Sequence, residues 1–330
     1  MRIIGMILLG LLAQLSAAEP RTEEVRFASG EIELAGTLVR PEGEGPFPGV
    51  VFVHGSGPHT RAGPVSYAST FTDAGVGMLA FDKRGSGESE GNWITSSLDD
   101  LVGDVCAAVD YLRAQPGFDA NRIGLWGVSQ GGWIAPVAAL RCGPMAFMIV
   151  VSGGAVSPLQ SELYSYQRAF ERGGIDAEQQ AEAFSVLGDY FWYLGTGKDR
   201  EKLIRRLEQV RERPWYRYAN LDRIMPSSEA GRLNWAWVAK FDPLPSISRF
   251  KAPVLLIFGD EDDNQPTEEA VKRWKQGMAL AGNDNYRIKV FEGANHGIRL
   301  GGDAHHGAGR PPLADGYPEI IGAWLADILE

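Results

Sequence analysis

The segment Gly127-Val128-Ser129-Gln130-Gly131 is the part of the chain best suited to covalent chemistry. An apolar run over 122–126 precedes it, and apolar residues at helical spacing follow it, at Trp133, Ile134, Val137 and Ala138. The serine is therefore expected on a sharp strand-to-helix turn, which is the context of a nucleophile elbow. Small residues two positions to either side let the backbone turn tightly. The pattern predicts Ser129 as a nucleophile, although the motif alone also fits a plain glycine-rich turn.

A second match to the same motif lies at 87–91, with Ser89 at its centre. It follows the charged Asp82-Lys83-Arg84, with no strand before it and no helix after it. A motif carries weight only in its structural context. We expect Ser89 to lie in a loop without a catalytic role.

A serine hydroxyl needs a base to take its proton, and the chain offers five histidines. His54 directly precedes a glycine-rich turn and is expected to be structural, whereas His59 lies in a loop. His305 and His306 belong to a glycine-rich segment. His296 ends a strand next to a glycine, a position that presents a side chain rigidly, so we predict it as the base.

The base needs a carboxylate to fix its tautomer, and the turn after Phe258 offers Asp260, Glu261, Asp262 and Asp263. Most of these should be solvated surface charges. The residues alone do not decide among them. Their place does give the chain order serine, acid, histidine, which is that of α/β-hydrolases.

These candidates follow a regular alternation of strands and helices. Short apolar runs typical of buried parallel strands occur at 49–53, 76–81, 122–126, 147–151 and 253–258, and a last strand is expected at 286–291. Two further strands, at 24–28 and 31–39, read as an antiparallel edge. Helical spacing lies between them, including a helix that Ser96 and Asp99 could cap. The fold class is therefore α/β, with a mostly parallel, doubly wound sheet.

Between 157 and 245 the apolar strands disappear and helical spacing takes over. We predict a helical insertion there, with the sheet domain formed by 19–156 and 246–330. The aromatic side chains of the insertion include Trp192, Trp215, Trp235 and Trp237. Most of them should form a small core of the insertion, and a minority should line an apolar substrate pocket under a lid.

Composition and charge limit the classes of partner. The chain has 330 residues, a formal net charge of -10 and no long run of lysines or arginines, so a nucleic-acid partner is not expected. Residues 1–18 read as a secretory signal, with Arg2, an apolar stretch over 3–12, and cleavage near Ala18 and Glu19. We expect a secreted or periplasmic protein, without a membrane association in its mature form. The oligomeric state is left open.

Cys106 and Cys142 are the two cysteines of the chain. An oxidising compartment permits a disulfide between them. Both fall in helical patterns, where a buried thiol behaves as a small hydrophobe, and we therefore expect them to be unpaired.

Taken together, these motifs resemble the α/β-hydrolase superfamily from about residue 31 to the end. The matching segments are His54–Gly57, Asp82–Ser89, Gly127–Gly131, Gly259–Asp262 and His296–Gly297. The resemblance implies Asp262 as the acid, three residues after the glycine that closes its strand, and it implies an oxyanion hole made by the backbone amides of Ser56 and Gln130. Gln265 departs from the family's usual hydrophobic residue before Pro266.

Within the superfamily the chain is similar to lidded bacterial serine carboxylesterases related to the prolyl-oligopeptidase-like group. This implies hydrolysis of carboxylic esters, of short to medium acyl chains, through an acyl-enzyme and with no cofactor or metal. An aminopeptidase or thioesterase would use the same triad. A member that only binds a small ligand, and a metal site at Asp303, His305 and His306, are less favoured alternatives.

Overall fold

The computed structural model describes residues 21–301 and 311–329, in which an eight-stranded sheet organises the fold. The strand order is β1-β2-β4-β3-β5-β6-β7-β8, and β3 to β8 run parallel. Their bounds are β1 Arg21–Ser29, β2 Ile32–Arg40, β3 Phe47–Val53, β4 Gly77–Phe81, β5 Phe118–Val128, β6 Met148–Val151, β7 Val254–Gly259 and β8 Tyr286–Phe291. The first two form an antiparallel hairpin, and β2 pairs antiparallel with β4. The predicted mostly parallel, doubly wound sheet is confirmed.

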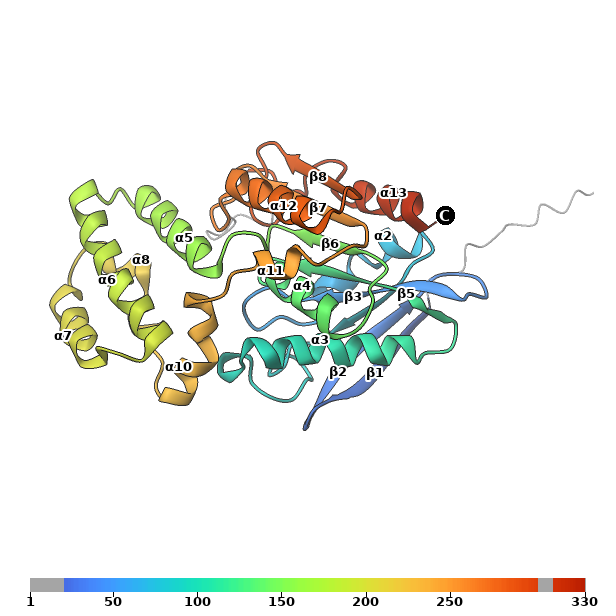
Figure 1. Cartoon of the computed structure of the whole chain (residues 1–330), viewed down its shortest axis with the longest axis horizontal. Coiled ribbons are helices and arrows are strands. Elements are labelled where there is room, and N and C mark those ends of the chain that lie inside the picture. Colours follow the sequence, from blue (N-terminus) through green and yellow to red (C-terminus); the bar gives the residue numbers. More distant parts are fainter. Residues whose placement is uncertain (1–20, 302–310, 330) are drawn as a thin grey trace, which may run out of the picture.

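Helices cover both faces of the sheet (Figure 1). One face packs against α3 (Leu98–Arg113), α4 (Gly131–Arg141), α11 (Leu244–Ile247) and α12 (Thr267–Ala281). The other face packs against α2 (Ala68–Thr72), which follows α1 (Ala62–Val65), and against α13 (Tyr317–Leu329). Branched and aromatic side chains of the central strands fill both layers, because strands buried on both faces cannot alternate with polar residues.

A group of helices lies between β6 and β7, to one side of the sheet (Figure 1). It comprises α5 Pro158–Arg172, α6 Ala177–Thr196, α7 Arg200–Val210, α8 Tyr216–Ala219, α9 Leu221–Ile224, α10 Glu229–Trp235 and the 3-10 helix η2 Ala236–Ala239. This insertion has its own hydrophobic core around Phe170, Leu187 and Trp215. The expectation that most of its aromatic side chains pack into such a core is confirmed, with Trp192 as an exposed exception.

Helix α3 begins one residue later than the sequence suggested. Its cap is Ser97, whose hydroxyl accepts a hydrogen bond from the Asp100 amide, while the Asp100 carboxylate accepts one from the Ser97 amide. This is a complete capping box. Ser96 instead donates its hydroxyl hydrogen to the Asn92 carbonyl, just after the 3-10 helix η1 (Trp93–Thr95), so the predicted cap at Ser96 and Asp99 is wrong.

The two cysteines are joined by a disulfide, which overturns the expectation that they are unpaired. Cys106 lies on α3 and Cys142 caps the end of α4. The two helices lie side by side on the same face of the sheet, and the cysteine Cα atoms are 5.0 Å apart. That adjacency is a property of the packed helices, which local helical spacing did not reveal.

The predicted signal segment 1–18, its cleavage point at Ala18 and Glu19, and the loop with Asp303, His305 and His306 lie outside the described residues. Among the described residues, no helix is long and apolar enough to cross a bilayer.

Candidate active site

The residues singled out from the sequence follow the carboxyl ends of neighbouring parallel strands. Ser56 follows β3, Ser129 follows β5, Asp262 follows β7 and His296 follows β8. Because the carboxyl ends of parallel strands meet at one edge of a sheet, these loops converge. The fold thus brings Ser129 and His296 into contact although they are 167 positions apart in sequence.

Ser129 sits on a strained turn between β5 and α4. Its φ is 55°, in the left-handed region that most residues avoid. A Cβ at Gly127 would lie 2.5 Å from the Gly131 carbonyl oxygen, and one at Gly131 would lie 2.2 Å from the Val53 carbonyl oxygen. The two glycines therefore let the chain approach closely enough to turn, which is the local basis of the elbow.

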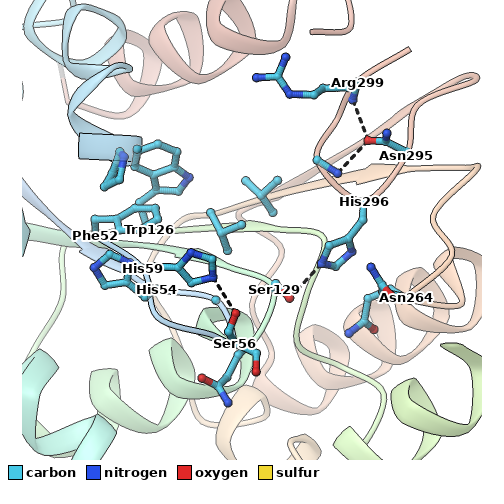
Figure 2. Close-up of a pocket in the computed structure, with 18 of the residues that line it drawn as sticks. Phe52, His54, Ser56, His59, Trp126, Ser129, Asn264, Asn295, His296 and Arg299 are labelled. Carbon is cyan, nitrogen blue, oxygen red and sulfur yellow. Dashed lines mark hydrogen bonds between the residues drawn. The ribbon is translucent and has the colours of Figure 1, made fainter. Parts of the chain in front are cut away.

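Ser129, His296 and Asp262 form a continuous hydrogen-bonded chain. The Ser129 Oγ is 2.9 Å from His296 Nε2, and His296 Nδ1 is 2.8 Å from Asp262 Oδ2 (Figure 2 shows the first contact). With Nδ1 protonated, His296 donates to the carboxylate and its Nε2 accepts from the serine hydroxyl. This arrangement can remove the hydroxyl proton as the oxygen attacks a carbonyl carbon.

Asp262 is buried, and its Oδ1 accepts hydrogen bonds from the amides of Asn264 and Gln265 at 2.7 and 2.9 Å. Of its neighbours, Asp260 accepts from the Gly293 amide, and Asp263 forms ion pairs with Arg168 and Arg172 of α5. Asp262 is the carboxylate of this turn that contacts His296, as the resemblance implied.

Ser56 lies on the side of Ser129 opposite His296, and Gln130 follows Ser129 directly in the chain. Figure 2 shows Ser56 and His59 on that side and His296 and Asn295 on the other. Within the described residues, the amides of Ser56 and Gln130 donate no hydrogen bond to a backbone or side-chain acceptor, and both residues line the cavity over Ser129. Unpaired amides at this place are available to an anionic oxygen.

His54 and His59 take the non-catalytic places expected of them. His54 is buried against the Phe81 carbonyl oxygen, and burial lowers its pKa to about 3, so it is uncharged at neutral pH. His59 Nε2 contacts the Ser56 carbonyl oxygen at 2.6 Å, and burial lowers its pKa too. Ser89 of the second motif is also structural, since its hydroxyl donates to the Asp82 carbonyl and accepts from the Ala35 amide.

A cavity of about 800 Å³ opens over Ser129. Its aromatic lining comes from the sheet domain, through Phe52, Tyr67, Trp126, Trp133 and Tyr317. Among the described residues, the insertion contributes Ser161, Glu162 and Ser165 instead. The prediction that some insertion aromatics line the pocket is wrong, because α5 turns this polar face to the cavity while its apolar side chains pack into the insertion's core.

Helix α5 is also fastened to the loop that carries Asp262. Ser161 Oγ donates to the Asn264 carbonyl at 2.7 Å and accepts from Gln265 Nε2 at 2.9 Å, and Tyr164 donates to the Asp262 carbonyl at 3.2 Å. Gln265, which stands where the family usually has a hydrophobic residue, thus forms a hydrogen bond with Ser161 in place of an apolar contact. Its side chain is buried, and its Oε1 has no hydrogen-bond partner among the described residues.

The sequence analysis gave no role to Glu162 or Lys83, although Lys83 lies in the matching segment Asp82–Ser89. Glu162 lines the cavity, and the surrounding protein raises the pKa of its carboxyl group. Nothing in the sequence distinguished it from other charges on a helix. Lys83 follows β4, so it lies at the same edge of the sheet as Ser129. That position after a strand could have singled it out from the sequence.

The fold and this arrangement of side chains define an α/β-hydrolase. Residues 46–301 match the model of the hydrolase family described as serine aminopeptidase, S33, and the chain belongs to that family.

Curated relatives include esterases and thiohydrolases. Esterase EstD of Thermotoga maritima is 27% identical over 270 residues, which cover 80% of this chain and 57% of EstD. Thiohydrolase aneE of Aspergillus aculeatus is 28% identical over 299 residues, 88% of this chain and 91% of aneE. Among solved structures, an esterase of Pyrococcus furiosus superposes with a TM-score of 0.58 at 17% identity, over 94% of this chain and 90% of the other, which is a likeness of fold.

Proposed function

We propose that this protein is an exported serine hydrolase that cleaves carboxylic esters through an acyl-enzyme, with Ser129 as nucleophile, His296 as base and Asp262 as the acid that orients it. One observation carries the proposal, the hydrogen-bonded chain from Ser129 Oγ through His296 to Asp262. Relatives named esterase and thiohydrolase support the reaction class.

The reaction follows from this geometry. Ser129 Oγ bonds to the ester carbonyl carbon while its proton passes to His296 Nε2, and the imidazolium that forms is stabilised by Asp262. Collapse of the tetrahedral intermediate breaks the bond to the alkoxy group, which leaves as the alcohol with the proton from His296. Water then attacks the acyl-enzyme with His296 again as base, and the carboxylic acid and Ser129 hydroxyl are released.

The amides of Ser56 and Gln130 would donate hydrogen bonds to the anionic oxygen of both tetrahedral intermediates. Each such donor is typically worth about 2.7 to 4 kcal/mol, because it meets a charge that exists only near the transition state. As backbone groups, they persist when the side chains of these residues are changed.

The cavity supports a substrate of modest size. Its volume of about 800 Å³ lies in the usual range for small-molecule sites, and aromatic side chains of the sheet domain line it. Short to medium acyl chains would fit such a space. The insertion forms one wall of this cavity and would act as its lid.

Export is part of the proposal. The signal-like segment over 1–18 motivates it, and the disulfide between Cys106 and Cys142 is what an oxidising compartment permits. Expression with and without residues 1–18, followed by fractionation, tests this. Retention of the full-length chain in the cytoplasm would contradict export.

The first experiment is labelling with a fluorophosphonate probe, which reacts with activated serines. Wild type should be labelled at Ser129, and Ser129→Ala should not. Ser89→Ala is the matched control, because Ser89 lies in the same motif without a neighbouring base and its loss should leave labelling intact. No labelling of the wild type would favour a protein that only binds ligands.

A second candidate is an aminopeptidase, and the polar wall of the cavity favours it. Glu162 has no hydrogen-bond or ion-pair partner among the described residues, and the nearby Gln265 Oε1 is also unpartnered. Two acceptors without donors would suit a substrate with a protonated amine. The family description, serine aminopeptidase, agrees with this alternative.

Matched substrates separate the candidates. An aryl acetate, an aryl thioester and an aminoacyl anilide should be compared with wild type, Glu162→Gln and Ser165→Ala. Turnover of the anilide alone, with KM raised by Glu162→Gln and unchanged by Ser165→Ala, would replace the esterase proposal. Turnover of the acetate, unchanged by Glu162→Gln, would sustain it.

A further inference from the structure

Lys83 is a buried lysine directly behind the wall of the candidate active site. It follows β4 and is 3% exposed. Its ammonium group donates hydrogen bonds to the Gly55 carbonyl oxygen at 2.6 Å and to Gln130 Oε1 at 2.7 Å. The ring of Trp93 covers it, with its centroid 5.3 Å from Nζ. Lys83 thus contacts the residue that precedes Ser56 and the residue that follows Ser129.

Within 21–301 and 311–329, no carboxylate lies within ion-pair distance of the Lys83 ammonium group. The nearby Asp82 pairs with Arg61, and Asp104 pairs with Arg84. Burial of an uncompensated cation is costly. A side chain kept in such surroundings beside a reactive serine is a candidate for a functional role.

The two acceptors of Lys83 are linked to the two proposed oxyanion donors, one through a shared peptide unit and one through a side chain. The Gly55 carbonyl and the Ser56 N–H are opposite ends of one planar peptide unit, so a cation bound at the oxygen fixes the direction of the N–H. A hydrogen bond accepted by the carbonyl also polarises the unit and strengthens the N–H as a donor. Gln130 is held through its side chain, and its own amide is the second donor.

We propose that Lys83 is a positioning residue of the oxyanion hole, which aims and polarises the Ser56 amide through the Gly55 carbonyl and fixes Gln130. This inference rests on the proposed hydrolase function. It assigns to the Asp82-Lys83-Arg84 segment a part in the chemistry, whereas the residues on either side of Lys83 are occupied in ion pairs.

The charge of Lys83 should depend on pH near neutrality. Burial lowers the pKa of Lys83 to about 7, and the charge of Asp104 on α3 acts in the opposite direction. His54 and His59 also face it, and both have lowered pKa values, so they are uncharged in this range. As pH rises through about 7, Lys83 loses its proton and becomes a weaker donor. The turnover rate should therefore fall on the alkaline side.

The test compares wild type with Lys83→Met on an aryl ester across pH 5 to 9. The expected result is a fall of about 10-fold or more in kcat with KM little changed, since an oxyanion donor acts in the transition state. The alkaline fall in kcat should be absent from the variant. Lys251→Met is the matched control, because Lys251 also donates to a backbone carbonyl, that of Ala281, far from the cavity.

A second readout separates oxyanion stabilisation from a merely structural role. A trifluoromethyl ketone forms a tetrahedral adduct with a charged oxygen, whereas an amide of the same shape mimics the ground state. Lys83→Met should weaken binding of the ketone by the same factor by which it lowers kcat. Binding of the amide should not change. Equal loss for both inhibitors would show a general distortion and overturn the inference.

If Lys83→Met does not fold, as judged by circular dichroism, Gln130→Glu carries the test. A carboxylate in hydrogen-bond contact raises the pKa of a lysine, so the alkaline fall should move to higher pH. The inference would be overturned if the alkaline fall in kcat, here called the alkaline limb, stayed at the same pH in Gln130→Glu, or if a folded Lys83→Met kept its kcat. Either result would leave the hydrolase proposal intact. A wild type that turns over no substrate of the ester, thioester and anilide panel would overturn both.

Discussion

Ser129 lies between two supports that are built in different ways. On the acid–base side, the loop that carries Asp262 is held by neutral donors, through the amides of Asn264 and Gln265 and the hydroxyls of α5, and Asp262 in turn holds His296. On the oxyanion side, the Gly55–Ser56 turn and Gln130 are held by the ammonium group of Lys83. The loop that carries Asp262 is therefore held by neutral hydrogen-bond donors, whereas the turn beside Ser56 and the side chain of Gln130 are held by a buried ammonium group.

Because the two sides are held by different interactions, they should respond to different changes. The acid–base side is tied to the insertion, so changes in α5 should reach Asp262. The oxyanion side depends on a group with its pKa lowered to about 7, so pH should act there. A substrate entering the cavity meets both sides at Ser129.

The largest expected effect comes from removing the charge on the acid–base side. Asp262→Asn should lower kcat by about 10⁴-fold, because an amide at this place favours the wrong tautomer of His296. Stopped-time assays on an aryl ester measure it. Asp263→Asn is the control, since its carboxylate pairs with Arg168 and Arg172 and not with His296, and it should keep nearly full activity. Comparable losses in both variants would mean that loop geometry, not the carboxylate, governs the rate.

A change that touches neither support should alter stability alone. The disulfide of Cys106 with Cys142 spans 36 positions, and closing a loop of that length stabilises a fold by about 3 to 4 kcal/mol in the chain-entropy treatment. Replacement of both cysteines by serine should lower the free energy of unfolding in urea by about that amount. The kcat value at 25 °C should not change. A parallel loss of kcat would show that the α3–α4 link also holds the elbow.

The sheet, Ser129 and His296 were accessible from the sequence because their signals are local. Buried parallel strands are short apolar runs, and the elbow is a spacing of glycines around Ser129 that the close approach of Gly131 to Val53 requires. His296 could be chosen by its place after a strand. Asp262 needed the family resemblance, because four carboxylates share its turn and their directions depend on the loop's own hydrogen bonds.

The remaining features depend on packing between distant segments. The disulfide requires α3 and α4 to lie side by side, and the contact of Lys83 with the Gly55 carbonyl requires the loop after β4 to reach the turn after β3. The polar wall of the cavity depends on which face α5 turns inward, and helical spacing gives the faces of a helix without saying what each one meets. Pairwise contacts of this kind have no signature in a single local stretch.

The smallest expected effect tests the link between the insertion and the acid–base side. Ser161→Ala removes a hydroxyl that joins the Asn264 carbonyl to the buried side chain of Gln265, and loss of such a buried partner costs about 1 to 3 kcal/mol. The change should raise hydrogen exchange at the Asn264 and Gln265 amides and lower kcat modestly, while the alkaline limb assigned to Lys83 stays in place. Ser165→Ala is the control, because its hydroxyl contacts the Asn264 side chain in an exposed setting, and it should change neither quantity. A shift of the alkaline limb by Ser161→Ala would show that the two supports are coupled through Ser129, and the distinction between them would fail.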